Sequence, residues 1–350
     1  MNAGMIWWGQ IGNSLRLISE VAEHLQECRS AVLWLPERLP WRSAFYEEVD
    51  IRRSAFGGRS LKRLSWSAGG DPGEFVLAKL CSAGVRADYW PGQSVADYLG
   101  SRQSLPMNDY YVWITGVRTK ADLAKWAEFI AQYDRASARP DGRAVFLVEY
   151  AGPALETGPV DQIGYTLEDY DCRVFCLEAA AALKNAQLRE YQAELALRIG
   201  GTDPEFSWAL LRAGEELLRD PVAATRDVMD RSREPGGRPF GPLSEQQIVS
   251  AAWRAALVLF FPVLEQWRLD FVSRYQQELH RHLPISNSNG DQVTDPFDLE
   301  IGALYYIVSL PGNPFTAGEV DIIRLCRRTR NLLAHNKMIS REDAWRIAQL

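Results

Sequence analysis

A basic stretch near the C-terminus carries the residue types that acid–base chemistry on a phosphodiester needs. An imidazole exchanges protons near neutral pH, and guanidinium groups hold phosphate oxygens through charge-assisted hydrogen bonds. A neighbouring amide can orient either group. The candidate catalytic residues are Arg328, Arg330, Asn331 and His335. Cations beside them are candidates for contact with an RNA backbone, and they are Arg324, Arg327 and Lys337.

The helix that must position these side chains is predicted to span residues 318–339. At roughly 100° per residue, Arg328, Asn331 and His335 fall within about 60° of each other, whereas Arg330 points about 140° away from His335. The predicted buried face has apolar spacings of three and four, and it contains Ile322, Leu325, Thr329, Leu332 and Leu333. A structural interpretation stays open, in which His335 caps or braces the helix and the arginines form a solvated face.

The order Arg330-Asn331, three residues, His335 resembles the signature of HEPN domains, helical bundles that end in an arginine and a histidine four to six residues apart. Four residues separate Arg330 from His335 and six separate Arg328 from His335. Both spacings fit the signature, so either arginine could belong to it. Residues 253–256, 259–265 and 295–302 also look like the upstream pattern of HEPN-like modules in bacterial multidomain proteins. The resemblance covers residues 243–350.

This resemblance implies a metal-independent endoribonuclease that needs no cofactor. His335 would act as general acid or base on the ribose 2′-hydroxyl or the leaving oxygen. Arg330 or Arg328 would stabilise the charge on phosphorus, and Asn331 would orient the imidazole or the phosphate. The resemblance further implies that two motifs face each other in a homodimer, and that the protein is a prokaryotic defence or toxin component, which could act with another defence protein.

Composition restricts where an RNA could bind. The chain has 350 residues and a net charge of −6, so nucleic-acid contact must be local, and the arginine-rich C-terminal helix is the expected place. The cysteines are five, scattered, and without partner ligands, so we expect buried thiols in a reducing compartment and no metal. No signal peptide is visible, and the apolar residues 251–264 are interrupted by Arg254 and Pro262. A cytoplasmic protein without a membrane span is predicted.

The N-terminal half alternates predicted strands and helices, which favours a parallel sheet covered by helices. Residues 1–180 resemble a P-loop NTPase of the AAA or STAND type, because an apolar run at residues 4–8 precedes a glycine-rich turn and a helix. The remaining strands are predicted at residues 31–35, 110–115, 144–150 and 172–177, with a helix at residues 121–136. The fold class is therefore α/β plus all-α, with a C-terminal HEPN-like bundle.

The phosphate-binding chemistry of such enzymes is missing. A Walker A motif needs lysine followed by serine or threonine, and Leu15 and Arg16 occupy those places. The strand at residues 110–114 ends without a carboxylate, and Glu149 at the end of the next strand has either a structural or a metal-binding interpretation. A degenerate domain is predicted. Its turn could still attract an anion through backbone N–H groups, or it could be only a tight turn, and its residues are Gly9, Gly12, Asn13 and Ser14.

Composition predicts an insertion within the N-terminal domain and two segments that follow this domain. Residues 52–106 have the composition of an irregular insertion with a short helix near residues 74–82. Residues 181–229 are predicted to form a helical lid, and residues 230–242, rich in Arg, Pro and Gly, a linker. Residues 243–350 then form the bundle, with one helix pair broken near Pro262.

Two function classes follow from these observations. The first is the endoribonuclease, controlled by a catalytically dead NTPase-like domain. The second is a non-catalytic interaction or nucleic-acid-binding protein, in which a pseudo-NTPase and an inactive bundle bind a partner without turnover. An NTPase with unusual nucleotide contacts is a third possibility.

Purified protein is expected to show no ATP hydrolysis, because Leu15 and Arg16 replace the residues that would hold the terminal phosphates and Mg²⁺. The measurement is phosphate release at saturating ATP. Steady release that a Gly12 substitution abolishes would contradict this prediction.

Overall fold

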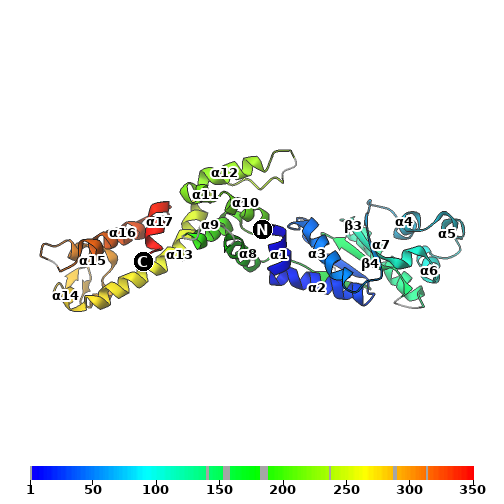
Figure 1. Cartoon of the computed structure of the whole chain (residues 1–350), viewed down its shortest axis with the longest axis horizontal. Coiled ribbons are helices and arrows are strands. Elements are labelled where there is room, and N and C mark those ends of the chain that lie inside the picture. The colour runs from blue at the N-terminus through cyan, green and yellow to red at the C-terminus, as the bar shows by residue number, and fades with distance from the viewer. Residues whose placement is uncertain are drawn as a thin grey trace. The chain divides into compact units, whose positions relative to one another are not determined.

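The computed structural model describes residues 2–138, 142–152, 158–181, 188–235, 238–286, 290–312 and 314–350. The chain divides into two compact units, Met1–Asp171 and Cys172–Leu350 (Figure 1). Unit 1 contains a parallel sheet covered by helices, and the described residues of unit 2 are helical apart from one short two-stranded sheet. The predicted combination of an α/β part followed by a helical part is confirmed at this level.

The sheet of unit 1 has the strand order β2-β3-β4-β1-β5, and every neighbouring pair is parallel. Every residue of β4 is buried, as expected for a central strand with helices on both faces. The predictions at residues 31–35, 110–115 and 144–150 are confirmed by three of the strands. The bounds are β1 (Ala31–Trp34), β2 (Ser60–Ser65), β3 (Tyr110–Val117), β4 (Val145–Tyr150) and β5 (Asp161–Gly164).

Helices pack on this sheet through aromatic side chains. On one face, Trp126 of α7 contacts Phe146 of β4, with ring centroids 6.4 Å apart. Trp113 of β3 packs edge-on against Phe45 of α3 at 5.7 Å. The helical elements of this unit are α1 (Ala3–Gln10), α2 (Gly12–Gln26), α3 (Arg42–Ser54), α4 (Pro72–Leu80), α5 (Ala83–Ala87), α6 (Val95–Gly100), η1 (Pro106–Asp109) and α7 (Lys120–Ala136).

Two predicted strands are wrong. Residues 4–8 belong to α1, whose N-cap Asn2 accepts a hydrogen bond from the backbone N–H of Gly4. Residues 172–177 belong to helix α8 (Asp169–Ala181), where Cys172, Phe175, Cys176 and Ala179 are buried at helical spacing. A short apolar run cannot by itself distinguish a buried helix from a buried strand.

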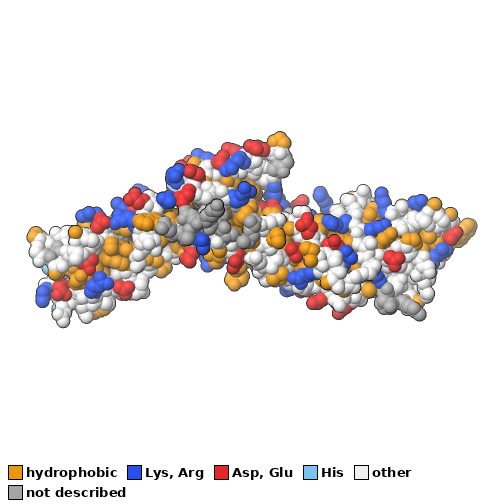
Figure 2. Space-filling model, viewed as in Figure 1, with side chains coloured by type: hydrophobic (Ala, Val, Ile, Leu, Met, Phe, Trp, Pro, Cys, Tyr) orange, Lys and Arg blue, Asp and Glu red, His pale blue; other side chains and the backbone are white. Residues whose placement is uncertain are grey.

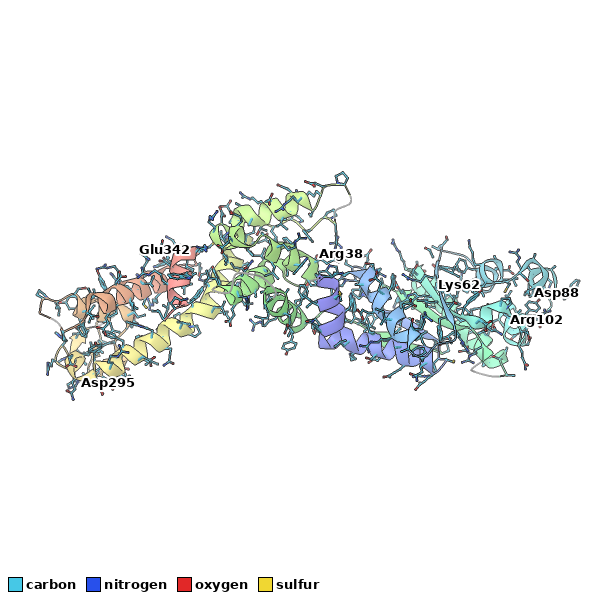
Figure 3. All side chains as sticks on the ribbon, viewed as in Figure 1. Arg38, Lys62, Asp88, Arg102, Asp295 and Glu342 are labelled. Atoms are coloured by element: carbon cyan, nitrogen blue, oxygen red, sulfur yellow. The ribbon has the colours of Figure 1, made fainter. Side chains whose placement is uncertain are left out.

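The short helix predicted near residues 74–82 is confirmed by α4, but the interpretation of residues 52–106 as an otherwise irregular insertion is wrong. They contain edge strand β2 and helices α4, α5 and α6. Strand β2 has no buried residue, and it carries Lys62, which is labelled in Figure 3. The ammonium group of Lys62 lies 3.7 Å from the ring centroid of Tyr110. Positive charge on an edge strand discourages pairing with other chains, and it also removes the apolar pattern by which a strand is predicted.

Glu149 has a structural role at the carboxyl end of β4. Its side chain is buried, and it accepts hydrogen bonds from the Tyr46 hydroxyl at 2.7 Å and from Trp113 Nε1 at 2.8 Å. The Arg42 guanidinium forms an ion pair with the same carboxylate. Burial, followed by the charge of Glu149, raises the pKa of Tyr46 to about 12, so its hydroxyl stays a donor at neutral pH. The carboxylate joins β3 and β4 to α3.

Unit 2 is arranged around one long helix. Helix α13 (Glu245–Arg274) contacts α9, α12, α16 and α17. It continues through Pro262, so the predicted break is wrong. Proline leaves the carbonyl of Val258 without its helical donor, and Val258 lies exposed, where water can replace that donor. The other helices here are α9 (Arg189–Gly200), α10 (Pro204–Arg212), α11 (Glu215–Arg219), α12 (Pro221–Arg231), α14 (Gln276–His280), η3 (Pro296–Asp298), α15 (Ile301–Val308), α16 (Ala317–Ala334) and α17 (Arg341–Ile347).

Helix α13 is also the one helix, in the part of the chain that the structure describes, with the length and apolar character to cross a bilayer. The uninterrupted helix is thus longer than the apolar stretch of residues 251–264 that the sequence suggested. Core helices of globular proteins meet the same two criteria, and the N-terminal half of α13 buries Ile248, Ala252, Ala255, Ala256 and Phe260.

The predicted linker lies inside unit 2, and its described part is held in place. Arg238 forms ion pairs with Asp203, at 3.0 Å, and with Glu205. The ring of Phe240 stacks on Phe206, with centroids 4.5 Å apart. Residues 203–206 begin α10, so these contacts hold the connector between α12 and α13 against that helix.

Glu149→Ala is expected to lower the free energy of unfolding by about 3 kcal/mol, because Trp113 and Tyr46 lose their acceptor and Arg42 loses its partner. Urea denaturation measures the change. The matched control is Glu128→Ala, whose exposed carboxylate pairs with exposed Arg135, and a change within about 0.5 kcal/mol is expected there. Equal effects of the two substitutions would contradict the structural role of Glu149.

Candidate functional site

Helix α16 carries most of the candidate residues, and it has defined ends. Thr316 and Glu319 form a capping box at its start. At its end Asn336 adopts a left-handed conformation (φ 55°), and the Lys337 N–H donates to the Leu332 carbonyl at 2.9 Å. This is the pattern of a Schellman cap. The helix therefore stops at Ala334 rather than at residue 339, and His335 is its C-cap.

The buried face of α16 is close to the prediction. Leu325, Thr329 and Leu333 are buried as expected, whereas Ile322 and Leu332 are half-buried. Ile323 and Cys326 are buried in addition. The indole Nε1 of Trp253 in α13 donates to the Leu333 carbonyl at 2.7 Å. That carbonyl is one of the last of the helix, so this bond fixes the end of α16 against α13.

Arg328 and Arg330 point to different neighbours. The Arg330 guanidinium lies 3.4 Å from the carboxylate of Glu300, the N-cap residue of α15. Arg328 forms an ion pair with Asp343, in the first turn of α17. Asp343 is buried, whereas Glu300 is mostly exposed. The two arginines thus do not form one cationic ridge, and their ion pairs differ in exposure.

Asn331 and His335 are the two candidate catalytic residues whose side chains have no partner among the described residues. Neither side chain forms a hydrogen bond or ion pair with any residue that the structure describes, and both are exposed. The backbone N–H of His335 bonds the carbonyls of Asn331 and Leu332, as its capping position requires. An exposed imidazole and amide at the end of a rigid helix are available to a ligand.

The three predicted RNA-contacting residues differ in their surroundings. Arg324 lies 3.8 Å from Asp321, and Arg327 lies over the Tyr305 ring at 4.6 Å. The pKa of Tyr305 is lowered, mainly by a hydrogen bond with Arg324. Lys337 is exposed beyond the cap. Charges of both signs are interspersed over the visible surface (Figure 2).

A groove lies beside Arg330. Its volume is about 580 Å³, and it is bounded by the middle of α13, the start of α15 and the end of α16. Phe261 and Phe297 on its walls are each about 40% exposed. Its polar lining is Glu265, Arg268, Asp298, Glu300 and Arg330. Glu300 and Asp343 were not predicted, because each lies 15 or more residues along the chain from the arginine that it pairs with.

The predicted anion-binding turn has a different structure. No strand precedes it. Gly9 lies in the last turn of α1, Gly12 begins α2, and Ile11 separates the two helices. Asn13 donates to the Thr166 carbonyl and to Asp171, each at 2.9 Å. The buried Ser14 hydroxyl lies 3.0 Å from the Tyr165 hydroxyl. These side chains hold residues 165–171 against α2, which supports the structural interpretation of the turn.

The cysteines and the acidic residues do not gather into a metal centre anywhere in the described ranges. Cys172 and Cys176 are buried thiols, and burial raises the pKa of Cys176 to about 12. A thiol with such a pKa stays protonated and is a poor metal ligand.

The two arginines are expected to differ in their effect on stability. Arg328→Ala leaves the buried Asp343 carboxylate without its cation and should cost about 2 kcal/mol of unfolding free energy. Arg330→Ala removes an exposed pair and should cost less than about 1 kcal/mol. Denaturant melts of the two variants check this difference. Equal losses would show that the Asp343 pair is no stronger than the Glu300 pair.

Neither a protein-family model nor a curated protein matches this chain.

Proposed function

We propose that this protein is a metal-independent endoribonuclease whose site lies at the end of α16. The observation that carries the proposal is the exposed, uncommitted imidazole of His335, fixed on a helix cap beside Asn331 and close in sequence to Arg330. These groups supply a proton acceptor, an orienting amide and a phosphate-binding cation. RNA is the substrate class because its 2′-hydroxyl can act as the nucleophile without a metal.

Arg330, rather than Arg328, is the arginine that holds the phosphate. Its pair with Glu300 is exposed on both sides, and such pairs contribute about 0–1 kcal/mol. A phosphate can therefore displace Glu300 at little cost. Arg328 is tied to buried Asp343, which would lose its only cationic partner among the described residues if Arg328 turned to a ligand. The burial of Asp343 and the exposure of Glu300 therefore favour the shorter arginine–histidine gap, from Arg330 to His335.

The reaction needs a proton acceptor and a proton donor. His335 takes the proton of the 2′-hydroxyl as its oxygen attacks phosphorus, and the bond from phosphorus to the 5′-oxygen breaks. The leaving 5′-oxygen must receive a proton. A second His335, from another copy of the chain, supplies it in protonated form. Arg330 stabilises the negative charge on the phosphorus centre, and Asn331 orients the phosphate or the imidazole.

The groove beside Arg330 suits a homodimer. Its apolar walls, which include Phe261 and Phe297, are partly exposed, and its charged lining contains residues of both signs. In a twofold dimer the same surface of each copy contacts the other, and this surface offers apolar walls and charges of both signs for such a contact. Ala334, which precedes His335, lines the groove, and we therefore place the second copy, with its own His335, at this surface.

A non-catalytic interaction protein is the second candidate, and a specific observation favours it. Each arginine of α16 between residues 324 and 330 already has an acidic or aromatic partner. In unit 1, the carboxylate of Glu149 is fully used by three donors. In this second candidate a pseudo-NTPase domain and a binding bundle act with another defence protein in the cytoplasm. Neither the NTPase-like domain nor the end of α16 would then catalyse a reaction.

Wild-type protein is expected to cleave a mixed RNA pool in EDTA, and His335→Ala should abolish cleavage while its melting temperature stays unchanged. An exposed imidazole contributes within about 0.5 kcal/mol to stability. The matched control is His280→Ala, which removes an exposed histidine at the end of α14 and should keep full activity.

Two outcomes would contradict the ribonuclease. Wild-type protein that fails to cleave at any concentration, with or without added partner, favours the interaction protein. Cleavage that His335→Ala retains would place the activity elsewhere in the chain, and a strict requirement for Mg²⁺ would exclude the side-chain mechanism described above.

A further inference from the structure

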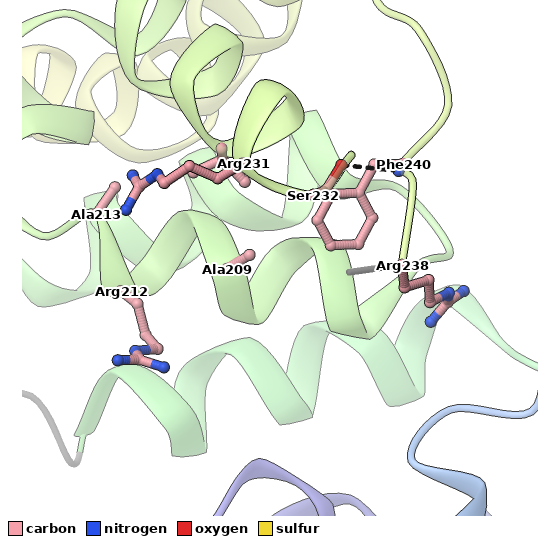
Figure 4. A pocket seen from close by; sticks show the side chains of 8 residues that line it. Ala209, Arg212, Ala213, Arg231, Ser232, Arg238 and Phe240 are labelled. Atoms are coloured by element: carbon pink, nitrogen blue, oxygen red, sulfur yellow. Dashed lines mark hydrogen bonds between the residues drawn. The ribbon is translucent and has the colours of Figure 1, made fainter. Parts of the chain in front are cut away.

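A second pocket of unit 2 lies away from the end of α16. It has a volume of about 350 Å³ and is bounded by α10, the end of α12 and the connector that follows α12 (Figure 4). Small organic ligands occupy pockets of about 300–1,000 Å³, so this one has room for a single compact molecule.

One part of the pocket is apolar. Ala209 and Val228 contribute small aliphatic side chains, and Phe240 contributes a ring. That ring stacks on Phe206 with an interplanar angle of 17°, and the Phe240 N–H donates to the buried Ser232 hydroxyl at 3.2 Å. The ring is therefore held at a fixed angle, which suits contact with a flat ligand surface.

The cationic part comes from three elements. Arg212 of α10 is exposed, and its guanidinium pairs with no residue that the structure describes. Arg231 of α12 pairs with Asp227 one turn earlier, and both side chains are about 60% exposed. Arg238 pairs with Asp203 and Glu205, which are only 25% and 19% exposed. In Figure 4 Arg212 and Arg231 lie at one side of the pocket, with their guanidinium groups extending in different directions, and Arg238 and Phe240 lie at the other side.

These ion pairs assign different roles to the three arginines. The exposed pair between Arg231 and Asp227 is weak, and a ligand anion can replace the carboxylate. A ligand anion that binds Arg212 displaces no carboxylate among the described residues. Arg238 is held by two half-buried carboxylates, and it anchors the connector rather than the ligand. Two guanidinium groups are thus available at one side of the pocket.

We propose that this pocket binds a small organic phosphate with a planar ring, of mononucleotide size. Arg212 and Arg231 hold the phosphate through charge-assisted hydrogen bonds, and Val228, Ala209 and Phe240 contact the ring. A ligand bound there bridges α10, α12 and the connector that leads to Ser244 at the start of α13. This proposal is independent of the ribonuclease.

The test is calorimetric titration of the full chain with four probes: AMP, adenosine, ribose 5-phosphate and inorganic phosphate. AMP is expected to bind most tightly, because it alone offers both the phosphate and the ring. Arg212→Gln should weaken AMP binding at least about tenfold, as expected for loss of a charge-assisted hydrogen bond. Arg219→Gln, an exposed arginine of α11 paired with Glu216, is the matched control and should leave the affinity unchanged.

Each remaining outcome overturns the assignment. If no probe binds at millimolar concentration, the pocket is not a phosphate site. If inorganic phosphate binds as tightly as AMP, the ring plays no part and the ligand class is wrong. If Arg330→Ala weakens AMP binding and Arg212→Gln does not, the nucleotide binds at the end of α16 instead. Thermal melts of every variant confirm that the fold is retained, because Arg212 has no described partner to lose.

Discussion

The end of helix α16 depends on how its last carbonyl groups are satisfied. Trp253 of α13 donates to the Leu333 carbonyl at 2.7 Å, and Lys337 donates to the Leu332 carbonyl at 2.9 Å. Helix ends leave such carbonyls without intrahelical donors, and a buried one without a partner is costly. The two bonds together fix where the helix stops and how it lies on α13. Asn331 and His335 take their positions from this arrangement, and so does the wall of the groove at Leu333.

Charge pairing determines which cations remain free to bind a ligand. Half-buried or buried carboxylates hold Arg42, Arg238 and Arg328, and these residues join elements of the fold. Exposed carboxylates pair with Arg231 and Arg330, which can exchange them for a phosphate. A net charge of −6 is therefore compatible with the two anion sites proposed here. The distinction depends on the burial of the acidic partner, which sequence spacing does not reveal.

Sequence patterns predicted the elements whose periodicity is unambiguous. The strands at residues 31–34, 110–117 and 145–150 and the helix at residues 120–136 were predicted closely because their apolar patterns are long or fully buried. Helix α1 was mistaken for a strand because it is apolar around its whole circumference. Strands β2 and β5 were missed because edge strands are short or polar. For the candidate site, the spacing of Arg328, Arg330, Asn331 and His335 could be read from the sequence, whereas the pairing of the two arginines with Asp343 and Glu300 depends on tertiary structure and could not be predicted.

The central claim is that two copies of His335 share one catalytic site. It is tested most directly by mixing wild-type protein with His335→Ala in equal amounts, allowing subunits to exchange, and measuring RNA cleavage. Random pairing makes one dimer in four a wild-type homodimer. A site that needs both imidazoles therefore predicts about one quarter of the cleavage rate that wild-type protein alone gives at the same total concentration. A rate of about one half would show that each copy works alone and would contradict the shared site.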